Sequence, residues 1–122
     1  MISNKQLAWL WPSLLILCIF FVSGTSDLAT PDVDIWFSKD KVGHFFVFGL
    51  LTTSITRIPF FRRLGLWGAV FAVILVVAWG GFDELRQSFT PGRSVELADW
   101  LADSFGAVCA GIAYYFWKSY RD

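Results

Sequence analysis

The chain has 122 residues, of which 56% are hydrophobic and only 16% are charged. Soluble domains usually carry about a quarter charged residues, so this composition excludes a disordered chain and argues against an ordinary soluble globule. The 10 basic and 10 acidic residues balance, which removes any general attraction to nucleic acid, and two cysteines are too few for a disulfide-dense scaffold. We therefore expect one all-α domain embedded in a lipid bilayer.

Two segments are apolar enough to be read directly as membrane-spanning helices. Residues 7–26 and residues 64–82 contain no formal charge, and each is close to the length of about 20 residues that a spanning helix needs. A signal peptide is the alternative for the first segment. Its apolar core is longer than usual and no A-x-A site follows, so we favour an uncleaved helix.

Two further segments, 42–56 and 104–117, reach spanning length only if the polar turns before them are included. We therefore predict four helices near 7–26, 38–57, 64–83 and 97–117. Asp40, His44, Asp99 and Asp103 then lie one or two turns inside the membrane. Ionisable groups are costly there, and this is a first indication of function.

Basic residues in short loops and near the termini predict the orientation of these helices. In a four-helix topology they all fall on one side, which the positive-inside rule makes cytoplasmic: Lys5, Arg57, Arg62, Arg63, Lys118 and Arg121. Every acidic residue except Asp122 falls on the opposite side. The sequence thus predicts a four-helix transmembrane bundle in the plasma membrane, with both termini cytoplasmic and a polar site at the outer face.

Small residues at four-residue spacing predict how the helices pack. Residues spaced by four share a helix face, and small residues let membrane helices approach closely. In the last helix Asp99 and Asp103 continue one such ridge, beside Ala107 and Gly111. We therefore expect both carboxylates to face the interior of the bundle rather than lipid.

The first polar group on the predicted outer side is Asp40 and His44. Because these residues are four apart, a helix places them on one face, where the carboxylate can orient the imidazole and raise its basicity. The alternative is an ordinary interfacial helix start, since an acid in the first turn suits the helix dipole.

Two more polar groups follow at the end of the third helix and the start of the fourth. Asp83 and Glu84 form a negative pair at a helix C-terminus, which opposes the dipole and suggests a role elsewhere, with Gln87 nearby. Arg93 follows a Pro-Gly turn and is expected above Asp99, where its planar fork suits a phosphate or carboxylate. A solvated loop start and a snorkelling arginine are the alternatives.

Together these residues supply a base, an anion clamp and electrostatic stabilisers, as phosphate-ester and acyl chemistry require. A metal site of Asp, Glu and His is a weaker interpretation, because the spacing matches no zinc motif, and we assign no metal ligand and no cofactor.

The order and spacing of these motifs, over residues 36–115, resemble the VanZ-like family. The resemblance rests on Lys39-Asp40-Lys41-Val42-Gly43-His44-Phe45 with Phe48, Asp83-Glu84-Leu85-Arg86-Gln87-Ser88-Phe89, Pro91-Gly92-Arg93, Asp99, and Asp103 with Gly106. It implies a small bacterial membrane protein with several helices, here a single domain over 1–122. The founding member of the family is associated with teicoplanin resistance. The family often has Asn where this chain has Asp103, which puts an amide-specific role there in doubt.

We keep two functional hypotheses. In the first, an outer-leaflet enzyme uses Asp40, His44, Glu84 and Asp99 as catalytic residues. Substrate-binding residues Gln87, Arg93 and Asp103 would hold an anionic phospholipid or a polyprenyl-phosphate-linked envelope precursor. In the second, the same residues bind an envelope lipid or scaffold a partner without turnover. Proton or ion transport is weaker, because the inner halves of the helices lack ionisable residues. The sequence indicates no oligomeric state.

Overall fold

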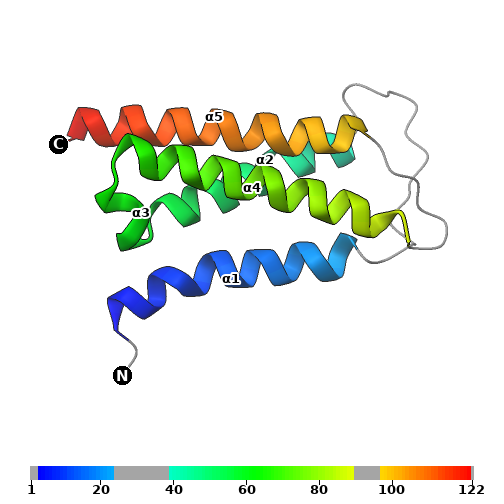
Figure 1. The fold of residues 1–122 in the computed structure, drawn as a ribbon, viewed down its shortest axis with the longest axis horizontal. Helices are drawn as coiled ribbons and strands as arrows, with labels where there is room; N and C mark the ends of the chain where they lie inside the picture. Colours follow the sequence, from blue (N-terminus) through cyan, green and yellow to red (C-terminus); the bar gives the residue numbers. More distant parts are fainter. Residues whose placement is uncertain (1–2, 24–38, 90–96, 122) are drawn as a thin grey trace.

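The computed structural model describes residues 3–23, 39–89 and 97–121, and every regular element in these ranges is a helix (Figure 1). The elements are α1 (Asn4–Ser23), α2 (Lys39–Thr56), α3 (Pro59–Arg63), α4 (Leu66–Gln87) and α5 (Leu97–Arg121). The prediction of an all-α fold is confirmed. The start of α1 and the end of α5 lie at the same end of the molecule (Figure 1).

The first helix begins earlier than predicted and the last helix ends later. The prediction was based on uncharged segments, and the limits of an uncharged segment are not the ends of a helix. We predicted a start at residue 7, but α1 begins at Asn4. Ser3 and Gln6 form a capping box there: the Gln6 amide donates to Ser3 Oγ at 3.2 Å and the Ser3 amide donates to Gln6 Oε1 at 2.9 Å. At the other end, α5 continues past residue 117 to Arg121.

The segment between the second and third long helices is not the simple loop that we predicted. It contains the short helix α3, whose first residue is Pro59, a position where the missing amide hydrogen costs nothing. Gly65 has a φ of +59° and turns the chain into α4. Helix α4 begins at Leu66 and ends at Gln87, later at both ends than the predicted 64–83, so Asp83 and Glu84 lie inside its last turns.

The most extensive helix contact joins α2 to α5. A Cβ atom on Gly106 of α5 would overlap the backbone carbonyl of Phe45 on α2, and a Cβ on Gly49 of α2 would lie 3.3 Å from the Gly106 oxygen. The two backbones therefore touch where glycine replaces a side chain. On α5, the ridge that carries Asp99, Asp103, Ala107 and Gly111 is buried, as predicted.

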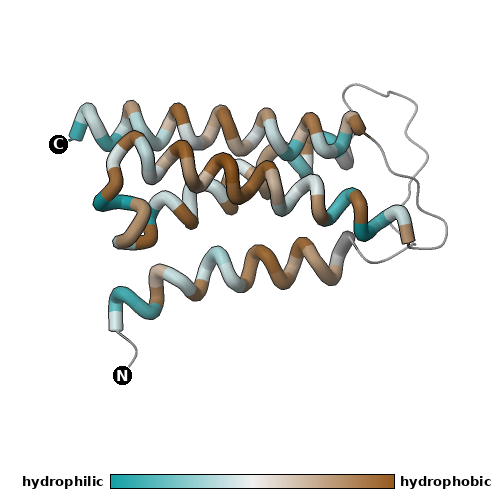
Figure 2. The backbone as a smooth tube through the Cα atoms, viewed as in Figure 1, coloured by the Kyte–Doolittle hydropathy of each residue, from teal (hydrophilic) through white to brown (hydrophobic). Residues whose placement is uncertain are grey.

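Much of the exterior is apolar, which is consistent with a membrane protein. Among the described residues, two helical segments are long and apolar enough to cross a bilayer, Asn4–Phe21 and Leu66–Gln87. Helix α4 is strongly hydrophobic along its middle, whereas polar residues collect toward helix ends (Figure 2). The other two predicted spans correspond to α2 and α5, which share the buried polar groups discussed below with the end of α4.

The contact between α2 and α5 predicts the effect of a single methyl group. Gly106→Ala should lower the free energy of unfolding by about 1–3 kcal/mol, because the two backbones must separate. The matched control is Gly43→Ala on α2, where an added Cβ meets nothing within 4 Å and better helix propensity is the only expected change. Denaturant titration in detergent, followed by circular dichroism, measures both. Equal stability of the two variants would contradict the close contact.

Candidate functional site

Buried polar side chains gather where the start of α2, the end of α4 and the start of α5 meet. Their side chains are only 1% to 8% exposed although they are polar or charged: Asp83, Glu84, Gln87, Asp99 and Asp103. We call these residues, with Lys41, His44 and Arg86, the polar cluster. Figure 2 shows the hydrophilic colour at this end of α4 and α5. Burial of so many polar groups needs partners, since each one unpaired is costly.

The shortest polar contact in the cluster joins His44 of α2 to Asp103 of α5, with 2.6 Å between Nδ1 and Oδ1. An ionised carboxylate can only accept, so toward an ionised Asp103 the imidazole donates its Nδ1 hydrogen. The imidazole also stacks on the Phe48 ring, with the centroids 6.0 Å apart. Asp103 and Phe48 thus hold the ring from two directions.

Helix α4 makes room for the Asp103 carboxylate through Gly80. A Cβ atom at Gly80 would lie 3.1 Å from Asp103 Oδ2 and 3.4 Å from Phe48 Cε1. Any larger residue at this position would compete with the carboxylate for space. The small residue at this position of α4 therefore helps to position the polar pair of the neighbouring helices.

A second contact between α2 and α5 lies one turn away. Lys41 Nζ is 3.5 Å from Asp99 Oδ1, and both side chains are largely buried. Lys41 and His44 are three apart on α2, and Asp99 and Asp103 are four apart on α5, so the two pairs follow one face of each helix. Asp83 and Asp99 are also close enough to interact electrostatically with Asp103.

The end of α4 organises the third part of the cluster. Gln87 Nε2 donates to Asp83 Oδ2 at 3.2 Å, and Arg86 Nη2 donates to Asp83 Oδ1 at 3.0 Å. These bonds require that the helix continue to Gln87, which explains why it ends later than predicted. Arg86 also reaches α1, where it donates to the Phe20 carbonyl at 2.7 Å and lies 4.1 Å from the centroid of the Phe20 ring.

The structure brings five of the seven predicted site residues to the same end of the molecule: His44, Glu84, Gln87, Asp99 and Asp103. Asp103 contacts the imidazole, a partner that the sequence did not indicate, and its predicted role in substrate binding stays a prediction. Asp40 belongs to α2, but its side chain, like all of Arg93, lies outside the described residues. The Asp40–His44 pair and the Arg93 clamp therefore stay predictions.

Two residues of the cluster were missed as site residues, Lys41 and Arg86. Both belong to the motifs that suggested the family. Each lies within one helical turn of a predicted site residue on its own helix, Lys41 near His44 on α2 and Arg86 beside Gln87 on α4. Only the fold shows that Lys41 meets a carboxylate on another helix and that Arg86 contacts α1.

The cluster supplies an oriented imidazole among carboxylates, which is an arrangement suited to proton transfer. Within the part of the chain that the structure describes, no three His, Cys, Asp or Glu side chains are grouped to hold a metal ion. Cys18 and Cys109 are free thiols.

An all-helical protein with apolar helices and a polar cluster buried at one end is the class that fold and site define. The chain belongs to the VanZ/LLP1 family, whose family model matches residues 4–118. The resemblance drawn from the motifs is thereby confirmed. No curated protein and no solved structure matches the chain.

The His44–Asp103 contact predicts energetic coupling between α2 and α5. In a double-mutant cycle of His44→Ala and Asp103→Ala, the two losses of unfolding free energy should be non-additive by about 1–3 kcal/mol, the range for hydrogen bonds to charged groups. Reversible unfolding of the four proteins in mixed micelles measures this coupling. Additive losses would show that the two side chains do not interact.

Proposed function

We propose that this protein is a multi-pass protein of the plasma membrane in which α1, α2, α4 and α5 cross the bilayer and the polar cluster lies at the outer face. The apolar exterior and the family support a membrane location. The orientation is supported by charge: Arg57, Arg62, Arg63, Lys118 and Arg121 lie toward the ends of helices remote from the cluster. Both termini are then cytoplasmic.

This topology predicts the labelling of single cysteines. In a variant with Cys18 and Cys109 replaced by alanine, a cysteine at the exposed Ser88 should react with a membrane-impermeant maleimide in intact cells. A cysteine at the exposed Arg63 should react only after the cells are lysed. The reverse pattern would invert the orientation, and labelling of both sites in intact cells would refute the spanning arrangement.

We further propose that the protein is an enzyme of the outer leaflet, and the contact between His44 and Asp103 carries this proposal. An imidazole held at Nδ1 by a carboxylate is the arrangement of a general base, because the carboxylate orients the ring and stabilises the imidazolium that forms. Nε2 would take a proton from a hydroxyl nucleophile as that oxygen attacks a phosphate or acyl centre. The imidazolium would then return the proton to the departing oxygen.

The remaining residues take supporting roles in this proposal. Glu84 and Asp99 would act as acid or electrostatic groups, Asp40 would assist the imidazole, and Gln87 and Arg93 would bind substrate. A phosphate-bearing substrate is favoured by the guanidinium of Arg93, hence an anionic phospholipid or a polyprenyl-phosphate-linked envelope precursor. A change in such precursors would alter the response to glycopeptides, which is how a role in teicoplanin resistance would arise.

One observation favours a second candidate, a protein that binds an envelope lipid or a partner without turnover. Lys41–Asp99 is an ion pair between α2 and α5, and such a pair can serve simply to hold two helices together. Binding tolerates small displacements of a charged group, whereas catalysis does not.

Lipid analysis of expressing cells separates the two candidates. Expression of the wild-type chain should change the amount of one envelope lipid or lipid-linked precursor, measured by mass spectrometry, and change teicoplanin susceptibility with it. His44→Gln and Asp103→Asn should abolish both effects at equal protein level, and Asp99→Glu should reduce them strongly, because a catalytic carboxylate is displaced.

The matched control for that experiment is Ser104→Ala, one residue from Asp103 on α5 and outside the polar cluster. It removes only a hydroxyl that donates to the Trp100 carbonyl at 2.8 Å, and it should leave the lipid profile at the wild-type level. Full effect of the His44→Gln protein would refute the enzyme. Full effect with Asp99→Glu, but loss with Asp99→Ala, would instead support binding.

A further inference from the structure

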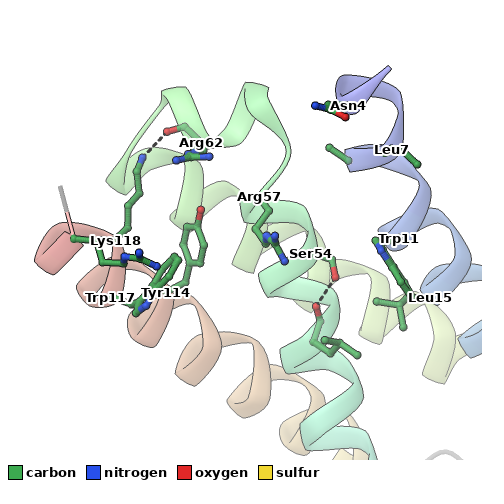
Figure 3. A pocket seen from close by; sticks show the side chains of 13 residues that line it. Asn4, Leu7, Trp11, Leu15, Ser54, Arg57, Arg62, Tyr114, Trp117 and Lys118 are labelled. Atoms are coloured by element: carbon green, nitrogen blue, oxygen red, sulfur yellow. Dashed lines mark hydrogen bonds between the residues drawn. The ribbon is translucent and has the colours of Figure 1, made fainter. Parts of the chain in front are cut away.

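A second site of different chemistry lies at the opposite end of the bundle from the polar cluster. A cavity of about 1020 Å³ opens between the first turns of α1, the end of α2, α3 and the last turns of α5 (Figure 3). This volume matches the upper range of pockets for small ligands, about 300–1,000 Å³. The polar cluster contributes no residue to its described lining.

Four cations line this cavity, from two separate stretches of the chain: Arg57, Arg62, Lys118 and Arg121. The described residues of the lining include no acidic side chain. Like charges that line one cavity favour the binding of an anion there. Arginine forks favour phosphate in particular, because two parallel N–H groups match two phosphate oxygens.

Two of the cationic side chains, Lys118 and Arg121, have contacts within the protein. Lys118 Nζ donates to the Arg62 carbonyl at 2.8 Å and so ties α5 to α3 across the cavity (Figure 3). The Arg121 guanidinium lies 5.2 Å from the centroid of the Trp117 ring. Arg57 lies, in this view, between Tyr114 on one side and Leu7 with Trp11 on the other (Figure 3). The site is therefore partly organised before any ligand arrives.

Part of the cavity wall is apolar, which favours a lipid over a free phosphate. Leu7, Trp11 and Leu15 come from α1, Leu50 from α2 and Trp117 from α5. Trp11 and Trp117 are both more than half exposed, as tryptophans at a membrane interface are. A ligand with a phosphate at the cations and a hydrocarbon chain along α1 would cover both surfaces.

We propose that this cavity binds the phosphate headgroup of an anionic phospholipid, with its acyl chain along α1, at the membrane face opposite the polar cluster. Basic pockets between membrane helices on the cytoplasmic side take such headgroups. The bound lipid would fill the space between α1 and the rest of the bundle. This site needs the chain to be in a membrane, but it does not depend on the proposed outer-face chemistry.

The competing explanation is that these residues only fix orientation and complement the C-terminal dipole of α5, with no specific ligand. Arg63 separates the two explanations. It lies on α3 beside Arg62 and is exposed, but it is not part of the lining. General electrostatic attraction would count both arginines equally, whereas a built site would depend on Arg62 alone.

The test uses the full chain in detergent micelles, titrated with brominated phosphatidylglycerol or brominated phosphatidylcholine, with tryptophan quenching as the readout. The concentration of brominated phosphatidylglycerol that quenches half of the tryptophan fluorescence of the wild-type protein should be at least tenfold lower than that of brominated phosphatidylcholine. The double variant Arg57→Gln/Arg62→Gln should lose this preference, and Arg63→Gln should keep it. The single variants Arg57→Gln and Arg62→Gln, each expected to lose part of the preference, decide the matter if the double variant does not fold.

Three results would overturn the proposal. Equal quenching by the two lipids would show that no anion is selected. Equal loss in Arg63→Gln and in the double variant would show general attraction only. Displacement of the lipid by glycerol phosphate at comparable concentration would show that the ligand is a soluble phosphate. None of these results depends on His44, so the outer-face enzyme stands or falls separately.

Discussion

The close approach of α2 and α5 is the constraint on which the polar cluster depends. Gly106 lets its helix touch the backbone of α2 at Phe45, one residue from His44 in the chain. Three residues before Gly106 on α5 stands Asp103, and with the backbones in contact its carboxylate reaches the imidazole at 2.6 Å. A wider separation would leave a buried carboxylate without its histidine, which is costly in any apolar environment. In this helix pair, the packing of small residues therefore also brings the polar side chains into contact.

The sequence predicted the long helices and the interior position of Asp99 and Asp103, because hydrophobic runs and four-residue spacing are local signals. It did not indicate contacts between residues that are remote in the chain. The predicted pairing of His44 with Asp40, four residues away, stays a prediction, and the contact of His44 with Asp103 on another helix was not foreseen. Lys41 and Arg86 escaped assignment for the same reason: one meets Asp99 and the other reaches the Phe20 carbonyl.

Helix boundaries show a different limit of inference from sequence. An uncharged, apolar segment of the sequence indicates which part of a helix lies in the hydrocarbon of a membrane. The helix itself extends further where capping hydrogen bonds or polar last turns continue it. Ser3 and Gln6 start α1 before the apolar run, and the bonds from Gln87 and Arg86 to Asp83 prolong α4 after its run. Helix α3 went unnoticed, since a five-residue helix is too short to show a periodic pattern. Pro59 is a residue typical of the first position of a helix, but the prediction for this segment considered only its arginines.

The confinement of the polar cluster to one end has an electrical consequence. Between the cluster and the cationic end, the sequence of α2, α4 and α5 carries no acidic or basic side chain over residues 45–56, 66–82 and 104–117. In the proposed orientation, a membrane voltage falls chiefly across this apolar stretch, where each elementary charge moved is worth about 2.3 kcal/mol per 100 mV. A proton that passes between His44 and Asp103 moves from one helix to its neighbour and not along the stretch. In that orientation, proton transfer between these two side chains would depend little on the membrane voltage.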